Sequence, residues 1–371
     1  MANSFVTLKD IARTALPHLM NNLVFPRLVH NDFSDGLAAK QGDTVQIRKP
    51  VNYVAQEFDA TAGTQVQDLI EDSVEVRLDK IATVDIEVSA LDAALNFDSV
   101  ERLFIEPAAI ALAEKINADG LLLYRDIASC VGEPGITPCT LEELSTIRGA
   151  LNYQAVPQYP RYAVWDTVAD TALTTIPALV NADKSGSTAA LREGSLGRIF
   201  GVDHYMSQSV AQHRTAMELY QGVNLSEAGA KGAQTIHVKG VALAGHFVKG
   251  DLIAIDGHTY TITEDSAEAA GNAIRDIRIF PGLVDDYDAE QQIIVLGDHT
   301  ANLAFHPSAF AFVSRPLSAP AGVESYVTSY DGISLRVVRG YDMKHKREML
   351  SMDVLYAYKT VYPEMAVRCL G

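Results

Sequence analysis

The sequence predicts an α+β fold of several domains, with a β-rich segment inserted late in the chain. Three patterns support this prediction. Apolar residues recur at helical spacing over about 105–128 and again after 140, and they alternate with polar residues over 43–48 and 74–88. From 223 to 298, glycines recur between short β-branched runs, as in a small barrel or sandwich. With 371 residues, the chain is long enough for two or three domains.

Composition excludes several classes of protein. A hydrophobic content of 48% with 21% charged residues indicates a folded globular protein. The net charge of −17 disfavours a protein that binds DNA by neutralising phosphates. The three cysteines form no Cys-x-x-Cys pair, which favours reduced thiols in a cytosolic setting. The sequence shows neither a signal peptide nor about eighteen consecutive apolar residues, so we expect neither export nor a membrane span.

An amphipathic arm is predicted over 1–40. Thr7 with Asp10 is a plausible helix start. Apolar residues then recur at helical spacing, at Leu8, Ile11, Ala12, Ala15 and Leu19. The alternative to an arm is an ordinary first helix that packs on its own domain.

A long hairpin is predicted over 41–90. Val45 and Ile47 alternate with polar residues, and so do the apolar residues of 74–88. The segment 50–72 lies between these strands and is too polar to make a core. It therefore predicts a projecting loop.

Three helical stretches are predicted within 91–165, and the first begins at Asp98 with Glu101. Pro107 suits the first turn of a long helix from about Ile105 to about Ala128. Thr140 and Glu143 have the spacing of a capping box, which predicts the start of a third helix.

The remaining pattern is mainly that of strands. Within 223–298, Asp256-Gly257 separates two β-branched runs and predicts a two-residue hairpin turn. Further strands are predicted over 161–165, 333–338, 349–358 and 361–370.

One segment, Arg192–Val210, carries a more specific pattern. Its informative residues are Gly194, Leu196, Gly197, Gly201, Tyr205 and Ser207. The segment resembles a signature of tailed-phage major capsid proteins, in which a Gly-Leu-Gly-like turn leads into a short strand that ends near a serine. A second segment, Phe247–Gly257, contains a Lys-Gly-Asp turn and resembles the inserted β-domain of the coat proteins of short-tailed Salmonella phages.

The resemblance implies a Hong Kong 97-like capsid fold and a division of the chain into named parts. These are an N-terminal arm (1–40), an extended-loop hairpin with adjoining strands (41–90), a peripheral domain with a spine helix (91–165), the first part of an axial domain (166–222), an inserted β-barrel domain (223–298) and closing strands of the axial and peripheral domains (299–371).

The resemblance also implies a function. The chain would assemble with itself, as hexamers and pentamers, into an icosahedral shell around a double-stranded DNA genome. It would have no catalytic role and no cofactor, and it would be located in the virion after assembly in the host cytoplasm. Implied partners are a separate scaffolding protein, because the arm is too short for a fused scaffold, a portal protein, decoration proteins and non-specifically held DNA. No membrane is implied.

Two groups of residues are candidate contacts in such a shell. The extended loop offers Arg48, Lys49, Tyr53, Glu57, Phe58, Asp59, Asp68, Leu69, Ile70, Glu71 and Asp72 for contacts between subunits. The arm offers Leu8, Asp10, Ile11, Ala15 and Leu19 for contacts with a scaffold or a neighbour.

Motifs for other chemistry are weak. No His-Glu-x-x-His motif occurs, and the spacing of His299 and His306 does not suggest shared metal coordination. Ser195 lies outside a Gly-x-Ser-x-Gly elbow, and no phosphate-binding glycine loop is present. The acidic run at 285–288 favours a solvated turn over a cation site. The basic run 344–347 is compatible with contact to nucleic acid, with contact to a neighbour's carboxylates, or with a solvated turn.

Two alternative functions stay open at this point. A cellular nanocompartment shell of the encapsulin type has the same fold and would enclose a cargo enzyme. A soluble hydrolase or glycan-binding protein would instead form a small oligomer with a saturable ligand site.

Overall fold

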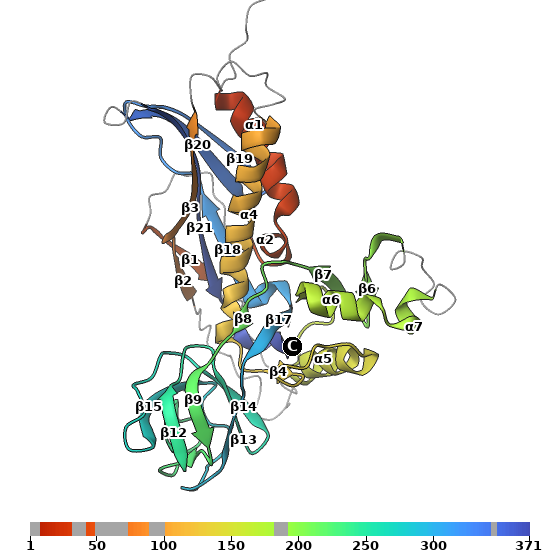
Figure 1. The fold of residues 1–371 in the computed structure, drawn as a ribbon, viewed down its shortest axis with the longest axis vertical. Coiled ribbons are helices and arrows are strands. Elements are labelled where there is room, and N and C mark those ends of the chain that lie inside the picture. Colours follow the sequence, from red (N-terminus) through yellow and green to blue (C-terminus); the bar gives the residue numbers. More distant parts are fainter. Residues whose placement is uncertain (1–7, 32–41, 49–72, 89–100, 182–191, 343–346) are drawn as a thin grey trace, which may run out of the picture. The chain divides into compact units, whose positions relative to one another are not determined.

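The computed structural model describes residues 8–31, 42–48, 73–88, 101–181, 192–342 and 347–371, which form two compact units (Figure 1). Unit 1 consists of Met1–Met20, Asn31–Leu112 and Phe312–Val361. Unit 2 consists of Asn21–His30, Ala113–Ala311 and Tyr362–Gly371.

Helices are concentrated in the first half of the chain. They are α1 (Leu8–Asn22), α2 (Phe25–Leu28), α4 (Glu106–Leu121), α5 (Leu141–Tyr153), α6 (Thr167–Thr174) and α7 (Pro177–Val180). A π-helical turn, Glu101–Ile105, precedes α4, and a 3-10 turn, Leu122–Asp126, follows it. Two further 3-10 turns are Pro307–Ala309 and Pro363–Met365. None of the described helices is long and apolar enough to cross a membrane.

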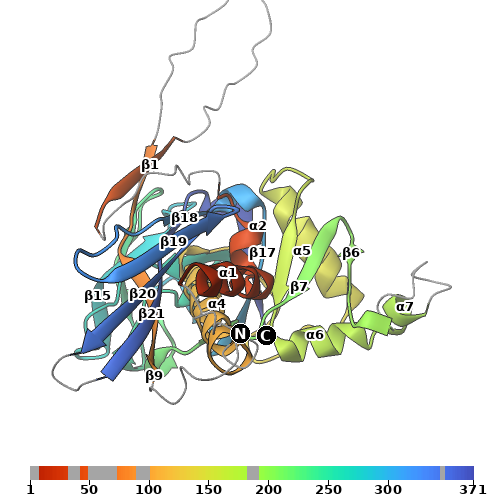
Figure 2. The same ribbon diagram turned by 90° about the horizontal axis from the view of Figure 1, so that it is seen from above.

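Unit 1 is built on a five-stranded sheet of β3 (Lys80–Val88), β18 (Phe310–Arg315), β19 (Glu324–Tyr330), β20 (Ile333–Asp342) and β21 (Arg347–Thr360). The strands β19, β20 and β21 lie side by side in Figure 2, and β21 also pairs with β3 along nine residue pairs from Val88 to Lys80.

The two faces of this sheet differ because side chains alternate along a strand. Leu335, Val337 and Met352 lie on one face and are fully buried. On the other face, Asp353 accepts hydrogen bonds from Arg336, at 2.6 and 3.0 Å. The second face is polar around this pair, but further along β21 both faces are buried, since Val354 and Leu355 have no exposed surface.

The predicted extended-loop hairpin has paired strands at its base. β1 (Thr44–Arg48) and β2 (Ser73–Arg77) are antiparallel in the register Thr44↔Arg77 to Arg48↔Ser73. This confirms the two predicted strands. The intervening loop lies outside the described residues.

Unit 2 contains a seven-stranded sheet in the order β4-β22-β17-β5-β7-β6, with β8 paired to β17 beside this path. Its strands are β4 (Cys130–Val131), β5 (Tyr162–Trp165), β6 (Arg198–Ile199), β7 (Val202–Met206), β8 (Gln212–His213), β17 (His299–Phe305) and β22 (Ala366–Leu370). Most pairs are antiparallel, but β5 with β7 and β4 with β22 are parallel.

Helices α5 and α6 pack on one face of this sheet (Figure 2). Both begin at caps that satisfy free backbone N–H groups. Thr140 and Glu143 form the predicted capping box of α5, and Asp166 accepts from the N–H groups of Val168 and Ala169 at the start of α6. The buried core there includes Trp165, which is 1% exposed.

The second sheet of unit 2 has six strands in the order β10-β11-β15-β14-β13-β16. They are β10 (Asn224–Leu225), β11 (Thr235–Lys239), β13 (Leu252–Ile255), β14 (His258–Ile262), β15 (Ala273–Phe280) and β16 (Ile293–Val295). The end strands meet, since Ile293 N–H donates to Val223 O at 2.8 Å and Leu225 N–H donates to Gln291 O at 2.9 Å.

Two further strands from this part of the sequence, β9 (Ala216–Gln221) and β12 (Ala242–His246), pair with each other as an antiparallel ribbon. Figure 1 shows β9 and β12 with β13, β14 and β15 in one body. The predicted hairpin turn at Asp256-Gly257 is confirmed, because both residues have positive φ, 49° and 79°, between the paired Ile255 and His258.

Two predicted elements have different bounds. The long helix expected to reach Ala128 ends as an α-helix at Leu121 and continues as the 3-10 turn. The expected closing strand 361–370 begins only at Ala366, because Pro363 starts a 3-10 turn and has no N–H to donate to a sheet.

Candidate functional site

The signature segment forms a tight hairpin at the edge of the seven-stranded sheet. β6 and β7 pair through Arg198↔Asp203 and Ile199↔Val202, so the turn between them is Phe200-Gly201. Both turn residues have positive φ, 49° and 82°. This is the backbone of a primed two-residue turn, in which glycine avoids the strain that a side chain would add.

The other signature residues lie just before this hairpin. Gly194 and Gly197 have φ values of 65° and 64°, in the left-handed region that glycine adopts without strain. Leu196 is partly buried and packs against the core under α5 and α6. The glycines of the signature are therefore explained by backbone conformation, and its leucine by packing.

Strand β7 is fixed to β5 by side chains as well as by backbone pairing. Trp165 Nε1–H donates to His204 Nδ1 at 2.9 Å, and the two rings stack with centroids 6.0 Å apart. Burial lowers the pKa of His204 to about 4, so the imidazole is neutral near pH 7 and can accept this bond. The strand ends at Met206, and the next residue, Ser207, donates its N–H to Trp165 O at 2.9 Å, so the strand ends near a serine as the signature predicts.

A second group of residues joins the six-stranded sheet to the turn after α4, within unit 2. We call it the junction; it consists of Tyr124, Arg125, Asp126, Ile127, His213, Lys249, Gly250, Asp251, Thr261, His299 and Arg368.

The Lys-Gly-Asp turn is the contact point of the six-stranded sheet. Gly250 has a φ of 97°, and a Cβ there would lie 2.7 Å from Arg125 Cγ and 3.1 Å from its Cα, so only glycine fits without a shift. Thr261 Oγ1 donates to Arg125 O at 2.9 Å, and Lys249 Nζ pairs with Asp126 Oδ1 at 2.8 Å. The turn therefore docks closely against the 3-10 turn, with side-chain bonds from Lys249 and Thr261 beside the close approach at Gly250.

Arg368 is the centre of the junction and is fully buried. Its guanidinium donates to three backbone carbonyls, Tyr124 O at 2.6 Å, Ile127 O at 3.0 Å and Gly250 O at 2.7 Å. It also lies over the Tyr124 ring, 4.9 Å from the centroid. Burial lowers the pKa of Arg368 to about 10, which leaves it charged near pH 7. Carbonyl dipoles and an aromatic face thus hold a buried cation.

These bonds accompany the change from α-helix to 3-10 turn that ends α4 before Ala128. In an α-helix, the carbonyls of residues 124 and 125 would accept from backbone N–H groups four residues on. Here Tyr124 O accepts from Arg368 and, in a 3-10 bond, from Ile127 N–H, and Arg125 O accepts from Thr261. The bonds come from strands far away in the sequence, so local periodicity could not predict them.

Two buried histidines complete the junction. His213 Nε2 lies 2.8 Å from Asp251 Oδ1, and its Nδ1 lies 2.9 Å from the Tyr124 hydroxyl. Asp251 also accepts from Val248 N–H at 2.8 Å. This order of groups resembles a catalytic triad, but the Tyr124 hydroxyl belongs to a residue only 1% exposed, so the bonds hold the side chains in place without presenting a nucleophile.

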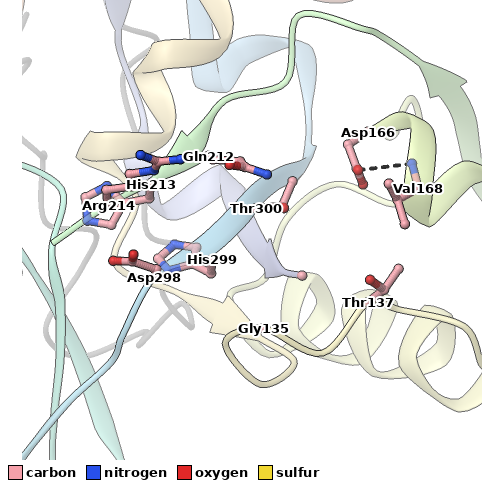
Figure 3. Close-up of a pocket in the computed structure, with 11 residues that line it drawn as sticks. Gly135, Thr137, Asp166, Val168, Gln212, His213, Arg214, Asp298, His299 and Thr300 are labelled. Carbon is pink, nitrogen blue, oxygen red and sulfur yellow. Dashed lines mark hydrogen bonds between the residues drawn. The ribbon is translucent and has the colours of Figure 1, made fainter.

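A polar pocket of about 470 Å³ opens beside the two histidines (Figure 3). It is lined by Gly135, Thr137, Asp166, Val168, Gln212, His213, Arg214, Asp298, His299, Thr300 and Gly371. Figure 3 shows His213 and His299 on the same side of this pocket, across from Asp166 and Val168. Among the described residues, no group of three histidine, cysteine or acidic side chains is placed to hold a metal ion.

Most of the predicted contact residues of the extended loop lie outside the residues that the structure describes. Arg48 ends β1 and pairs through its backbone with Ser73. The other ten, from Lys49 to Asp72, lie outside the described residues, so their contacts stay a prediction.

The predicted contact residues of the arm all lie on α1. Leu8, Ile11, Ala15 and Leu19 are buried within the single chain, at most 7% exposed, and Asp10 is exposed. The burial agrees with the alternative of a helix packed on its own chain. Contacts of these residues with a scaffold or neighbour stay a prediction.

The residues considered for other chemistry are scattered. His299 belongs to the junction, whereas His306 caps a 3-10 turn by accepting from Ser308 N–H. Asp286 accepts from Lys231 N–H at 2.7 Å in an exposed turn. The run at 344–346 lies outside the described residues.

Sequence reasoning missed the junction. Its available signal was the charged Arg368 within the otherwise apolar closing strand, since an arginine in such a strand must find polar partners when buried. Which carbonyls supply them depends on the tertiary fold.

Comparison with known proteins bears on the fold. No protein-family model matches the chain, and no curated protein sequence matches it significantly. Among solved structures, a chain from Mycobacterium phage Che8 is similar over 94% of this chain and 90% of its own length, with a TM-score of 0.50 and 16% identity.

Two further solved structures are similar at lower scores. One is from the asymmetric unit of the bacteriophage PhiM1 mature capsid, with a TM-score of 0.46, 10% identity and coverage of 94% of this chain and 86% of that one. The other is from the capsid of a native GTA particle, with a TM-score of 0.46, 8% identity and coverage of 100% and 92%. At these identities the likeness concerns the fold: the chain has a mixed α+β fold that it shares with the phage Che8 protein.

Proposed function

We propose that the protein is a major capsid protein that assembles with itself into the icosahedral shell of a tailed phage, and that its role is structural rather than catalytic. One observation carries this proposal. The likeness to a phage protein extends over nearly the whole of both chains, 94% of this one and 90% of the other. A likeness of that extent concerns the complete architecture and not a common small motif.

The order of elements supports the same proposal. A capsid protein of this kind needs an extended-loop hairpin, a long helix, a strand before the axial domain and a glycine turn, in that order. The chain has β1 with β2, then α4, then β5, then the hairpin of β6 and β7. The signature glycines are a property of the sequence itself, so they are a separate line of support.

The six-stranded sheet would be the inserted β-barrel domain of the Salmonella phage branch. Two features support this assignment. Its end strands are joined by the backbone bonds of Ile293 and Leu225, and its Lys249-Gly250-Asp251 turn has the sequence expected for the branch.

Assembly would depend mainly on apolar contact between subunits. Burial of the loop residues Tyr53, Phe58, Leu69 and Ile70 against a neighbour would contribute roughly 25 cal/mol per Å². Exposed charge pairs of the same loop would contribute at most about 1 kcal/mol each. The loop would thus hold neighbours together by hydrophobic burial, with its charges selecting the register.

Other partners follow from the same proposal. A separate scaffolding protein, a portal protein and decoration proteins would contact the shell during assembly and in the virion. Packaged double-stranded DNA would be held without sequence preference, and the net charge of −17 would keep that contact weak.

The proposal is tested by expressing the full chain with and without a candidate scaffolding protein. The products are examined by size exclusion and negative-stain electron microscopy. Closed shells or rings of capsomers support the proposal. A small oligomer that does not change with concentration under any condition contradicts it and favours a soluble enzyme or glycan-binding protein.

The contents of purified particles separate the two kinds of shell. A phage capsid encloses DNA, whereas a nanocompartment of the encapsulin type encloses a cargo enzyme. Protein inside the native particle in place of nucleic acid would therefore replace the phage assignment with the nanocompartment one.

A further inference from the structure

The junction depends on a buried cation placed against a neutral imidazole. Arg368 has no exposed surface, and His299, at 3% exposed, has a ring nitrogen beside it. His299 also lines the polar pocket of Figure 3, so water and protons can reach its ring from solvent. A buried titratable group with access to water is the physical requirement for a pH-sensitive contact.

The hydrogen bonds of His299 leave one position for an added proton. Nδ1 lies 2.9 Å from Gly297 O, and since a carbonyl can only accept, Nδ1 carries the proton of the neutral ring. Nε2 then holds a lone pair and lies 3.4 Å from Arg368 Nη1. A second proton must therefore bind at the nitrogen that faces the guanidinium.

We propose that this contact makes the junction acid-sensitive: proton uptake by His299 releases the six-stranded sheet from the 3-10 turn at 122–126. A charged His299 would repel Arg368, whose bonds to Tyr124 O, Ile127 O and Gly250 O connect the two parts. The inference does not depend on shell formation, since every group in it belongs to one chain.

The charged groups around His299 act in both directions. Arg368 on β22 and His213 on β8 disfavour a second proton, and Asp298 favours it. Further from the ring, the groups that face Arg368 are Tyr124, Cys130, Asp251 and Asp126. Asp251 is engaged by His213 and Val248 N–H. Burial is the largest influence, and together with Arg368 and His213 it lowers the pKa of His299 to about 4.

Release would be local because the six-stranded sheet has its own core. Its buried cluster includes Ile253, Ile255, Ile277 and Ile279, together with two tyrosines. Apolar side chains do not take up protons, so acid leaves this packing unchanged. The sheet should keep its backbone hydrogen bonds after it separates from the junction.

The test is hydrogen exchange of the full-length chain from pH 7 to pH 5, with rates corrected for the intrinsic pH dependence of exchange. The released state has a histidine of ordinary pKa, near 6.5, while the docked state has one near 4. Linkage then predicts that the opening equilibrium at 122–127 increases about 20-fold over this range. Amides of β13 and β14, and those of β20 and β21 in unit 1, should keep their protection.

The variant His299→Gln retains an acceptor toward Arg368 but cannot take up a proton. It should reduce the increase to less than about 3-fold. If His299→Gln does not fold, His299→Asn keeps a donor toward Gly297 O and serves instead. The matched control is His258→Gln, an exposed histidine on β14, which should leave the wild-type increase unchanged.

Three results would overturn the proposal. They are an equal increase in His299→Gln and wild type, no increase in wild type, and loss of protection in β13 and β14 together with the junction. The last would mean that acid unfolds the sheet as a whole. Failure of the chain to form shells would leave all of these measurements possible, so this test and that of the proposed function fail separately.

Discussion

The interior of the six-stranded sheet and the junction that anchors it are both buried, but they are held together by different forces. The interior is packed from isoleucine, leucine, valine and aromatic side chains. The buried polar centre of the junction consists of Arg368, His213, His299 and Asp251, which are held by directional hydrogen bonds. Apolar burial has no preferred direction, so it makes a sheet stable without fixing its orientation. Directional bonds to a buried cation fix the position of the sheet on its neighbour.

This difference suggests a division of roles. A core of apolar residues tolerates changes of shape that conserve volume. A buried charge tolerates almost no change, because removing a partner leaves polar groups without hydrogen bonds. We therefore expect the junction to respond to substitution and pH in ways that the interior does not.

The largest expected effect is that of Arg368→Met. The variant leaves the carbonyls of Tyr124, Ile127 and Gly250 without their partner, so the free energy of unfolding should fall by about 4 kcal/mol. Urea unfolding at pH 7 measures this. The control is Arg278→Met, which breaks an exposed pair with Glu264 and should change the stability by less than about 0.5 kcal/mol. Equal losses in the two variants would contradict a special role for the junction.

The next largest difference concerns conservative substitutions, which should lower the free energy of unfolding more in the junction than in the interior of the sheet. Arg368→Lys keeps the charge but loses the planar fork that reaches three carbonyls, so we expect a loss of about 3 kcal/mol. Ile253→Val, in the interior, should cost about 1 kcal/mol. The same urea experiment compares them. A tolerated lysine would mean that charge alone, without directional bonding, holds the junction.

Two glycines allow a smaller comparison. Gly250 and Gly257 both have positive φ, but a Cβ at Gly250 would meet Arg125, while one at Gly257 would meet nothing within 4 Å. Gly257→Ala should therefore cost about 1 kcal/mol from backbone strain alone, and Gly250→Ala about 2 kcal/mol. Thermal unfolding of both variants tests this. A smaller loss of stability in Gly250→Ala than in Gly257→Ala would contradict a close contact between Gly250 and Arg125.

The smallest expected effect is a change in tryptophan fluorescence at a second acid-sensitive site, the pair of Trp165 and His204. Trp165 is the single tryptophan, and it donates to neutral His204. The pKa of His204 is lowered to about 4 by burial, so its contribution to stability is complete above about pH 6.5 and is lost as the pH falls to about 4. Trp165 fluorescence should change near pH 4 and be unaffected by the opening of the junction near pH 5. His204→Gln should remove the change, and a transition that also depends on His299 would show that the two sites are coupled.

Local signals predicted much of the fold. The capping box of Thr140 with Glu143 and the turn at Asp256-Gly257 are set by neighbours in sequence, and both are confirmed. The alternation of Val45 and Ile47 with polar residues likewise identified β1. These signals work because caps, tight turns and strand periodicity depend on a few adjacent residues.

The junction could not be predicted in the same way. Arg368 meets Tyr124 across 244 positions in the chain, and Gly250 across 118. No local pattern encodes such pairings, although the Lys-Gly-Asp turn itself is visible in the sequence of the β-rich segment. The predicted loop contacts of 49–72 are different again, since they require a neighbouring subunit and no single chain can display them.

The most direct test of the proposed function is electron cryomicroscopy of the particles formed by the full chain together with a scaffolding protein. We predict closed shells with icosahedral symmetry, in which each subunit has this fold and residues 49–72 lie against a neighbouring subunit. Particles of a few subunits without closed symmetry, at every concentration tried, would contradict the proposal that this protein forms a shell.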